Sequence, residues 1–189
     1  MEEIENVEEV IETVKIPIKR IEDPEGDADS TLKMLESKLK ISLVVDEDGT
    51  VELEGSSINV FFAIPIIRAI GRGFEPRIAL KLQDDEYGFK LIDLRDYAKN
   101  PKDMARIKGR VIGEKGKAKE IIEQEAECNL AIWGHTVGII APLEVLTIAA
   151  TAVFKLIEGQ PHAGVYLYLE KNKRRRKEEE IKTKGNMWK

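Results

Sequence analysis

The chain has 189 residues, of which 42% are hydrophobic and 34% are charged, and its formal net charge at pH 7 is -5. No run approaches the roughly 18 consecutive apolar residues that a transmembrane helix requires, and a single cysteine, Cys128, excludes an internal disulfide and any metal site built from several cysteines. Met1 is followed by Glu2 and Glu3 rather than by a basic region and an apolar stretch, so no secretory signal is expected and the cytoplasm is the expected location.

The first half of the chain predicts an acidic arm followed by short strands and helices. Ser56 or Ser57 can cap the last of these helices, and Pro65 within it predicts a kink or a late start. The expected elements are a frayed helix or disordered arm (Glu2–Glu12), a strand (Lys15–Ile21), a helix (Ser30–Lys38), two strands (Ile41–Val45 and Val51–Leu53) and an apolar helix (Ile58–Ile70) that Gly71 and Gly73 end.

The second half predicts the same order of elements. These are a short strand near Met104–Ile107, a glycine loop, a helix from about Lys117 to Glu127, hairpin strands at Leu130–Trp133 and Val137–Ile140, a long helix from Pro142 to Gly159, and a last helix from near Val165. With an offset of 87 residues, Leu35 falls on Ile122 and Leu43 on Leu130, which indicates two copies of one unit. We therefore expect an α+β fold of two units that meet near Asn100 and Pro101, each a three-stranded sheet with helices packed on one face.

Charge is distributed unevenly between the two halves. Residues 1–100 contain 13 basic and 23 acidic side chains, a net charge of -10, whereas residues 101–189 contain 17 and 12, a net charge of +5. Contacts from Lys and Arg to phosphate supply most of the non-specific affinity of proteins for nucleic acid. The second half is therefore expected to attract a polyanion that the first half repels.

The segment Lys108–Lys117 is rich in glycine and basic residues and precedes a predicted helix. Gly113 and Gly116, three residues apart, let the backbone turn tightly and approach a ligand, while free amides and the dipole at the start of the helix favour an anion. Arg110, Lys115 and Lys117 add positive charge. The pattern predicts a phosphate-binding loop.

Other phosphate motifs and catalytic sets do not fit. A P-loop requires a glycine where Val111 stands and a hydroxyl where Ala118 stands. Gly71-Arg72-Gly73 begins a dinucleotide-like pattern, but Pro76 occupies the third glycine position and a helix precedes the pattern. No Ser/His/Asp set, carboxylate pair or metal-ligand spacing is apparent, so we expect a protein that is not an enzyme and carries no cofactor or metal.

The string Arg110-Val111-Ile112-Gly113-Glu114-Lys115-Gly116, followed by Ile121 and the hairpin at residues 130–140, resembles a KH domain of the eukaryotic type, type I. The Gly-x-x-Gly loop of such domains clamps about four nucleotides of a single strand. The resemblance implies that phosphates lie on the loop, that Gly109 and Arg110 lie on one wall, and that Leu130 and Ile132 form the apolar floor or the core beneath it. The residues implied to bind RNA are Lys108, Gly109, Arg110, Ile112, Gly113, Glu114, Lys115, Gly116, Lys117, Leu130 and Ile132.

Over nearly its whole length, the chain resembles archaeal tandem-KH ribosomal RNA-processing proteins, counterparts of the eukaryotic small-subunit assembly factor called partner of Nob. The segments Ala69–Phe74 and Leu91–Tyr97 support this, since the family carries a similar sequence between its two domains. The expected domains are an acidic arm (1–12), a KH-like domain with a degenerate loop (13–99), and a KH domain with the Gly-x-x-Gly loop and a basic C-terminal helix or tail (100–189). The resemblance implies binding near the 3' end of small-subunit rRNA, and association with the maturation endonuclease or the alpha subunit of initiation factor two.

The first copy departs from the family pattern at the loop. The sequence there reads Gly26-Asp27-Ala28-Asp29, with Asp at the second glycine position, and Glu22, Asp23 and Glu25 precede it. Carboxylates at this place would repel phosphate. The hypothesis is that the first domain faces a protein or is purely structural, while the second binds RNA.

Two other functions stay open. The acidic first half favours a protein-interaction adaptor for which RNA is secondary. A subunit of an RNA-degrading complex is the other reading, although such subunits usually carry a further RNA-binding fold for which no segment remains.

Three further features carry expectations. Cys128 is expected to be a small buried hydrophobe. Trp133 is predicted to pack in the core rather than to stack on a base. The basic run Lys171–Lys177 is either a solvated face or a track for an RNA backbone or for acidic protein side chains.

Overall fold

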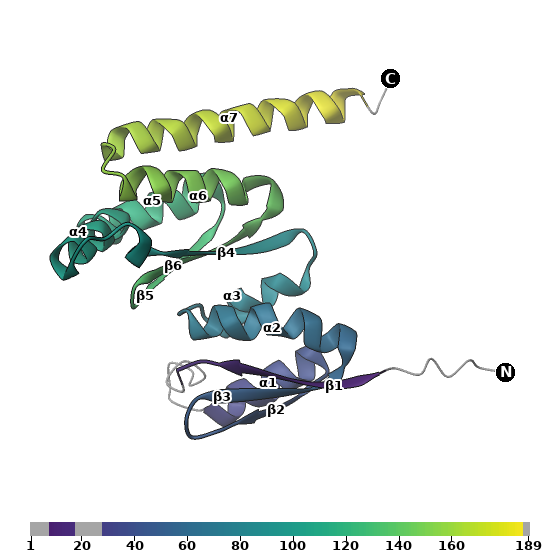
Figure 1. Ribbon diagram of the computed structural model, residues 1–189. Coiled ribbons are helices and arrows are strands. Elements are labelled where there is room, and N and C mark those ends of the chain that lie inside the picture. Colours follow the sequence, from purple (N-terminus) through teal and green to yellow (C-terminus); the bar gives the residue numbers. More distant parts are fainter. Residues whose placement is uncertain (1–7, 18–27, 187–189) are drawn as a thin grey trace. The chain divides into compact units, whose positions relative to one another are not determined.

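The computed structural model describes residues 8–17 and 28–186, and the chain divides into two compact units, residues 1–89 and residues 90–189 (Figure 1). Each unit is built on a three-stranded sheet accompanied by helices. The predicted mixture of helices with two three-stranded sheets is confirmed. Within the described ranges, no helix is both long enough and apolar enough to cross a membrane.

The first unit is a sheet with helices on one face. In the order β1-β3-β2, the central strand β3 pairs antiparallel with both neighbours. Along β3, Val51 and Leu53 are fully buried, whereas Glu52 and Glu54 point to the opposite face and are exposed. The buried face is covered by α2, which packs against β1 and β3, and by α1, which packs against β2. The elements are β1 (Glu9–Lys15), α1 (Ala28–Leu39), β2 (Ser42–Val45), β3 (Thr50–Ser56), α2 (Ser57–Gly71) and the short helix α3 (Pro76–Ala79).

The start of the first unit differs from the sequence prediction. The part of the expected acidic arm at Glu9–Glu12 is not helical or disordered but belongs to strand β1, where each residue is paired with β3. Of the strand expected at Lys15–Ile21, Ile16 and Pro17 are wrong, because β1 ends at Lys15. The Ile16 amide donates to the Gly49 carbonyl (2.8 Å), and Pro17 has no amide with which to continue the ladder. Residues 1–7 and 18–27 lie outside the described residues.

Helix α2 begins where a serine can cap it. The Ser56 side chain accepts a hydrogen bond from the Asn59 amide (3.3 Å), as the sequence predicted. The late start expected from Pro65 is wrong, because the helix already begins at Ser57 and Pro65 lies inside it. Its end at Gly71, followed by Gly73 at φ 101°, agrees with the prediction.

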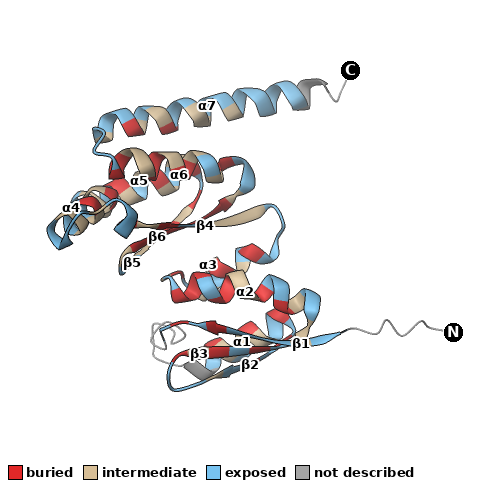
Figure 2. Cartoon of the chain, in the orientation of Figure 1, coloured by how far each residue is buried: buried red, intermediate tan, exposed pale blue. Residues whose placement is uncertain are grey.

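The second unit places its helices over a sheet of order β4-β6-β5 (Figure 1). Strand β6 is central and buried along almost its whole length (Figure 2), with α6 packed against it and α5 against β5. The elements are β4 (Tyr87–Asp93), α4 (Pro101–Ile112), α5 (Lys117–Ala126), β5 (Asn129–Trp133), β6 (Thr136–Pro142), α6 (Leu143–Ile157) and α7 (His162–Asn186).

The short strand expected at Met104–Ile107 is wrong, because these residues lie in helix α4. The Asn100 side chain accepts from the Asp103 amide (2.9 Å), and Pro101 is the first helical residue, a combination that starts helices. The strand that opens the unit is instead β4, ahead of Asn100 and Pro101. The two residues expected at the boundary therefore begin a helix inside the second unit.

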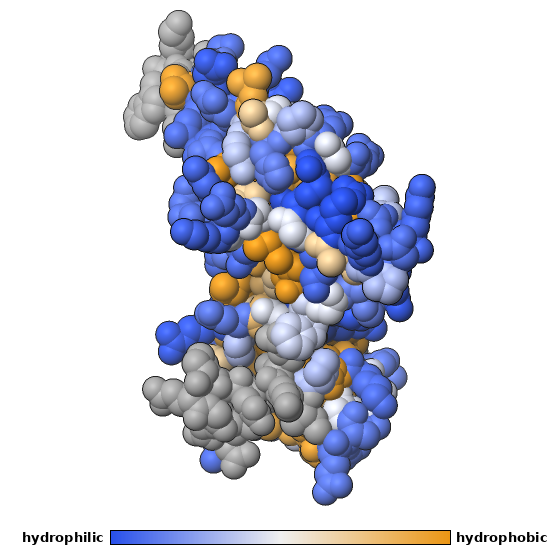
Figure 3. Space-filling model, turned by 90° about the vertical axis from the view of Figure 1, so that its left-hand side faces the viewer, coloured by the Kyte–Doolittle hydropathy of each residue, from blue (hydrophilic) through white to orange (hydrophobic). Residues whose placement is uncertain are grey.

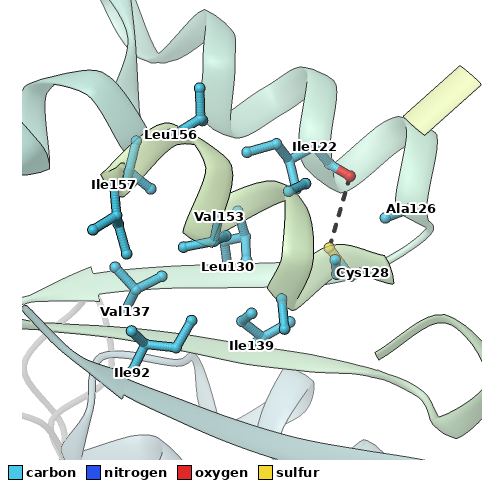
Figure 4. Close-up of a cluster of buried hydrophobic side chains, with 14 of the residues drawn as sticks. Ile92, Ile122, Ala126, Cys128, Leu130, Val137, Ile139, Val153, Leu156 and Ile157 are labelled. Carbon is cyan, nitrogen blue, oxygen red and sulfur yellow. Dashed lines mark hydrogen bonds between the residues drawn. The ribbon is translucent and has the colours of Figure 1, made fainter. Parts of the chain in front are cut away.

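Aliphatic side chains from strands and helices form the core of the second unit (Figure 4). Ile139 of β6, Ile122 of α5 and Val153 of α6 are fully buried within it. Cys128 is 6% exposed and its thiol lies 3.7 Å from the Ile122 carbonyl oxygen. Burial raises the pKa of this thiol to about 12, and the expectation of a small buried hydrophobe is confirmed.

Helix α7 is attached to the second unit by apolar and charged contacts. Leu169 is fully buried in the core. Lys173 pairs with Glu125 of α5 (3.4 Å), and Arg176, largely buried, pairs with Glu144 of α6 (3.3 Å). Part of the basic run is thus structural, and the surface at the top of Figure 3, where α7 lies, is mostly hydrophilic. The members of the run that stay exposed are Lys171, Arg174, Arg175 and Lys177.

Both units share details at positions 87 residues apart. The Glu36 carboxylate accepts from the Leu43 amide (2.9 Å), and the Glu123 carboxylate accepts from the Leu130 amide (2.7 Å). Lys40 and Glu127, also 87 apart, are both left-handed, at φ 54° and 52°. These matched contacts are what a repeated unit predicts. The two units differ in the length of the segment between the first strand and the matched helix. This segment is residues 16–27 between β1 and α1 in the first unit, and residues 94–116, which include α4, between β4 and α5 in the second.

Candidate nucleic-acid interface

Gly113 ends α4 in a conformation that requires glycine. Its φ of 76° and ψ of 175° lie in a region that residues with a Cβ almost never adopt. A Cβ built there would lie 2.6 Å from both the Cβ and the amide nitrogen of Ala118. The first glycine of the predicted loop is therefore fixed by the backbone and by the close approach of α5.

The rest of the loop is open to solvent. Lys115 is left-handed at φ 52° and ψ 29°, and Gly116 follows at φ 83°. A Cβ at Gly116 would meet nothing within 4 Å, so this side of the loop is accessible. Gly116 is also the N-cap of α5 and supplies no side-chain cap, so the positive end of the α5 dipole is not covered by a side chain.

The loop carries two exposed cations beside that helix end. Lys115 and Lys117 are both exposed, and among the described residues neither forms an ion pair. Glu114 is also exposed and is the one acidic residue of the loop. Figure 3, which views the side of the molecule on which α4 lies in Figure 1, shows a surface with many hydrophilic residues. Anions are attracted by this combination of exposed lysines and the positive end of the helix dipole.

Two of the predicted basic residues hold α4 in place. The Lys108 ammonium donates to the Gly134 carbonyl in the β5–β6 turn (2.7 Å). The Arg110 guanidinium donates through Nε to the Leu156 carbonyl at the end of α6 (2.9 Å) and through a terminal nitrogen to the Gln160 carbonyl. Both side chains therefore brace the loop, and their charges lie at fixed positions near it.

The predicted floor is mostly core. Leu130 is 4% exposed and belongs to the hydrophobic core, whereas Ile132 and Ile112 are only half-buried. Trp133 was expected in the core but is 44% exposed at the end of β5. Because successive strand residues point to opposite faces, Trp133 lies on the sheet face opposite Ile132.

A cavity of about 380 Å³ lies beside the loop, and we call it the rear pocket. Five of the predicted RNA-binding residues line it, including the loop glycine Gly113, while Leu130 and Ile132 do not. The contribution of α7 was not predicted, because no pattern in the residues at its start indicates that they return to the loop. The lining residues are Arg106, Gly109, Arg110, Gly113, Glu114, Lys117, Ala118, His162 and Tyr166.

Residues 88–174 match the eukaryotic-type KH domain family, KH type I, in the form of the second KH domain of PNO1. The match begins within β4 and covers the loop, the hairpin and the first half of α7. The prediction of a type I KH domain in the second half is confirmed, while a KH assignment of the first unit stays a prediction.

The chain is similar to proteins of archaea and fungi. It is 39% identical over 184 residues to a KH domain-containing protein of Methanocaldococcus jannaschii, covering 95% of this chain and 79% of that protein. It is 34% identical over 116 residues to the pre-rRNA-processing protein pno1 of Aspergillus fumigatus, covering 59% of this chain but only 46% of that protein.

A solved archaeal structure has the same fold. The likeness is to a chain of the a/eIF2alpha-aDim2p-rRNA complex from Pyrococcus horikoshii, with a TM-score of 0.78, 34% identity, and coverage of 92% of this chain and 99% of that chain. The long match to the Methanocaldococcus protein and the family match over the loop agree with the resemblance read from the sequence. The chain belongs to the archaeal family of KH-domain rRNA-processing proteins related to pno1.

Proposed function

We propose that the chain binds single-stranded RNA through the loop Gly113–Gly116 of the second unit, with the 3' end of small-subunit rRNA as its target during ribosome assembly. The observation that carries the proposal is the open side of this loop, where Lys115 and Lys117 flank the uncapped start of α5. The rRNA in the complex of the Pyrococcus relative supports the choice of ligand. The role proposed is binding without catalysis, in keeping with the family.

The test of this proposal is a titration of short RNAs followed by fluorescence anisotropy. We expect a single-stranded oligonucleotide of the 16S rRNA 3' end to bind more tightly than the same sequence in a duplex and than a scrambled strand. The logarithm of the affinity should fall linearly with the logarithm of the salt concentration, by about 0.7 for each phosphate neutralised. An affinity that depends neither on strandedness nor on salt would contradict the proposal.

We further propose that the first unit is a KH-like domain that docks a protein. Gly26 and Asp27 of its expected loop lie outside the described residues, and Asp29 lies in the first turn of α1. The shorter connection there, residues 16–27, leaves less chain for a groove wall than the 23 residues from 94 to 116 in the second unit. This difference supports the proposal that the second unit, and not the first, binds the RNA.

The surface proposed for docking is the face of the first sheet opposite the one on which α1 and α2 pack. On it Ile11 of β1 is 60% exposed opposite Glu54, and Val44 of β2 is 54% exposed opposite Glu52. Apolar side chains surrounded by carboxylates suit a partner that presents both apolar and basic side chains. The alpha subunit of initiation factor two, present in the complex of the Pyrococcus relative, is the partner proposed.

Changing Ile11 and Val44 together to lysine is expected to weaken binding of that alpha subunit at least about tenfold, because each lysine removes apolar contact and repels a basic partner. Isothermal titration calorimetry measures the change. The matched control, Leu167→Lys with Ile181→Lys, alters two equally exposed apolar side chains on α7 and should leave the affinity unchanged. Equal losses in both double variants would refute this docking surface while leaving RNA binding untouched.

A further inference from the structure

The rear pocket only partly overlaps the groove that the KH resemblance implies, since Gly109 and Arg110 are assigned to both. That groove is expected to use β5, but the residues that line the rear pocket come from α4, the loop, the start of α5 and the start of α7, with none from β5. Its volume of about 380 Å³ falls in the range of roughly 300–1,000 Å³ that is typical of ligand sites. The loop therefore has a second concave side.

Positive charge dominates the walls of the rear pocket. Arg106, Arg110 and Lys117 line it, against a single carboxylate, Glu114. Arg110 is held rigidly by its two bonds to backbone carbonyls, and these bonds use two of the five N–H groups of a guanidinium. Arg106 is exposed and pairs with Asp103 of its own helix (2.8 Å). Because an exposed ion pair contributes little stability, an anionic ligand can take the place of Asp103 at little cost in free energy.

Helix α7 closes the other side of the pocket and is itself fixed. Nε2 of His162 lies 2.9 Å from the Arg110 carbonyl oxygen, and since a carbonyl only accepts, Nε2 must carry the proton. The ring of Tyr166 lies 6.0 Å from that of His162. Burial raises the pKa of Tyr166, so its phenol remains a hydrogen-bond donor. Val165, between these two residues, is fully buried in the core and holds the turn in place.

We propose that the rear pocket binds the phosphate, with its sugar, of the nucleotide adjoining those on the Gly113–Gly116 loop, so that Arg106 and Tyr166 extend the RNA site behind the loop. The inference rests on the function proposed above. An RNA strand is favoured over an acidic protein segment, because Gly113 and Glu114 of the loop, and Lys117 directly after it, also line the pocket. A strand lying on the loop thus passes directly into the pocket.

Length-dependent binding tests this site. Anisotropy titrations of the full chain with a four-nucleotide and an eight-nucleotide RNA compare the wild type with Arg106→Gln/Tyr166→Phe. The double variant keeps the tyrosine ring and removes one charge and one hydroxyl. We expect its affinity for the longer RNA to fall about tenfold, the size expected when a charge-assisted hydrogen bond is removed, and we expect it to bind the four-nucleotide RNA like the wild type.

Two further variants make the result decisive. Arg77→Gln/Tyr87→Phe makes the same chemical changes on α3 and β4, outside the rear pocket and outside the basic run of α7, and should bind both RNAs normally. Lys115→Asp should weaken the binding of both RNAs, since Lys115 lies on the loop itself. If Lys115→Asp weakens binding but Arg106→Gln/Tyr166→Phe does not, or if the Arg77→Gln/Tyr87→Phe control loses as much affinity, the rear pocket is not an RNA site. If no variant changes binding, the proposed function fails as well.

Discussion

Replacing Lys115 by aspartate and Lys117 by glutamate is expected to lower the affinity for single-stranded RNA about 30-fold to 100-fold, because each exchange turns an attraction to phosphate into a repulsion worth roughly tenfold. Both side chains are exposed beside the uncapped start of α5, where a bound phosphate would lie. Fluorescence anisotropy at several salt concentrations measures the affinity. The slope against the logarithm of salt should also fall, by about 0.7 for each phosphate that the variant no longer neutralises.

These two exchanges are compatible with the local fold. Lys115 is left-handed, and aspartate is among the residues that tolerate this conformation best. Lys117 is the first residue of α5, where a carboxylate interacts favourably with the helix dipole. The control variant, Lys102→Asp with Lys182→Glu, changes the net charge equally at exposed positions away from the loop. It should lower the affinity for single-stranded RNA less than about threefold. A loss of similar size in both variants would indicate a non-specific charge effect and contradict the clamp.

Substituting Gly113 by alanine is expected to destabilise the second unit by about 3 to 5 kcal/mol, because backbone strain and steric overlap act together. The backbone at Gly113 lies in a region reserved for glycine, and the new Cβ would approach the Cβ and amide of Ala118 to 2.6 Å. Ala118 cannot move away from the new Cβ, since it is buried at the start of α5. Trp133 lies in β5 of the second unit, and the sequence has no tryptophan before it, so tryptophan fluorescence during urea unfolding measures the stability of the second unit.

Gly116→Ala is the matched control for this change. Gly116 also has a positive φ, 83°, but a Cβ there meets nothing within 4 Å, so only the conformational cost of about 1 to 2 kcal/mol applies. If the two alanine variants were equally stable, the close approach of Ala118 would not be the reason for glycine at position 113. The same comparison explains why Gly113→Asp is unsuitable for testing RNA binding, since lost affinity would accompany lost stability.

The features predicted best are those that depend on residues close to one another in the sequence. The loop glycines, helix α5 and the β5–β6 hairpin follow from local turn and helix signals, and the structure has them close to the expected residues. The repeat of 87 residues was also visible, because buried side chains recur in register, and it extends to the hydrogen bonds of Glu36 and Glu123.

The predictions were wrong or missing where local signals compete or where distant segments meet. Met104–Ile107 was assigned to a strand, although the Asn100 cap and the first-position Pro101 start a helix there. The acidic arm was expected to be unpaired, because no local pattern indicates that Glu9–Glu12 pairs with β3 more than forty residues later. The rear pocket could not be predicted, since it requires His162 to return to Arg110 across 52 positions.

The carboxylates of Glu36 and Glu123 have a consequence for how partners bind. Each accepts the amide of an edge strand, at Leu43 in β2 and at Leu130 in β5, so a backbone donor that would otherwise point outward is already occupied. Another protein therefore cannot extend either sheet along this edge by β-augmentation without first displacing a glutamate. Along β2 and β5, selectivity toward partners must then come from side chains rather than from backbone pairing, and the same two glutamates hinder edge-to-edge self-association through these two strands.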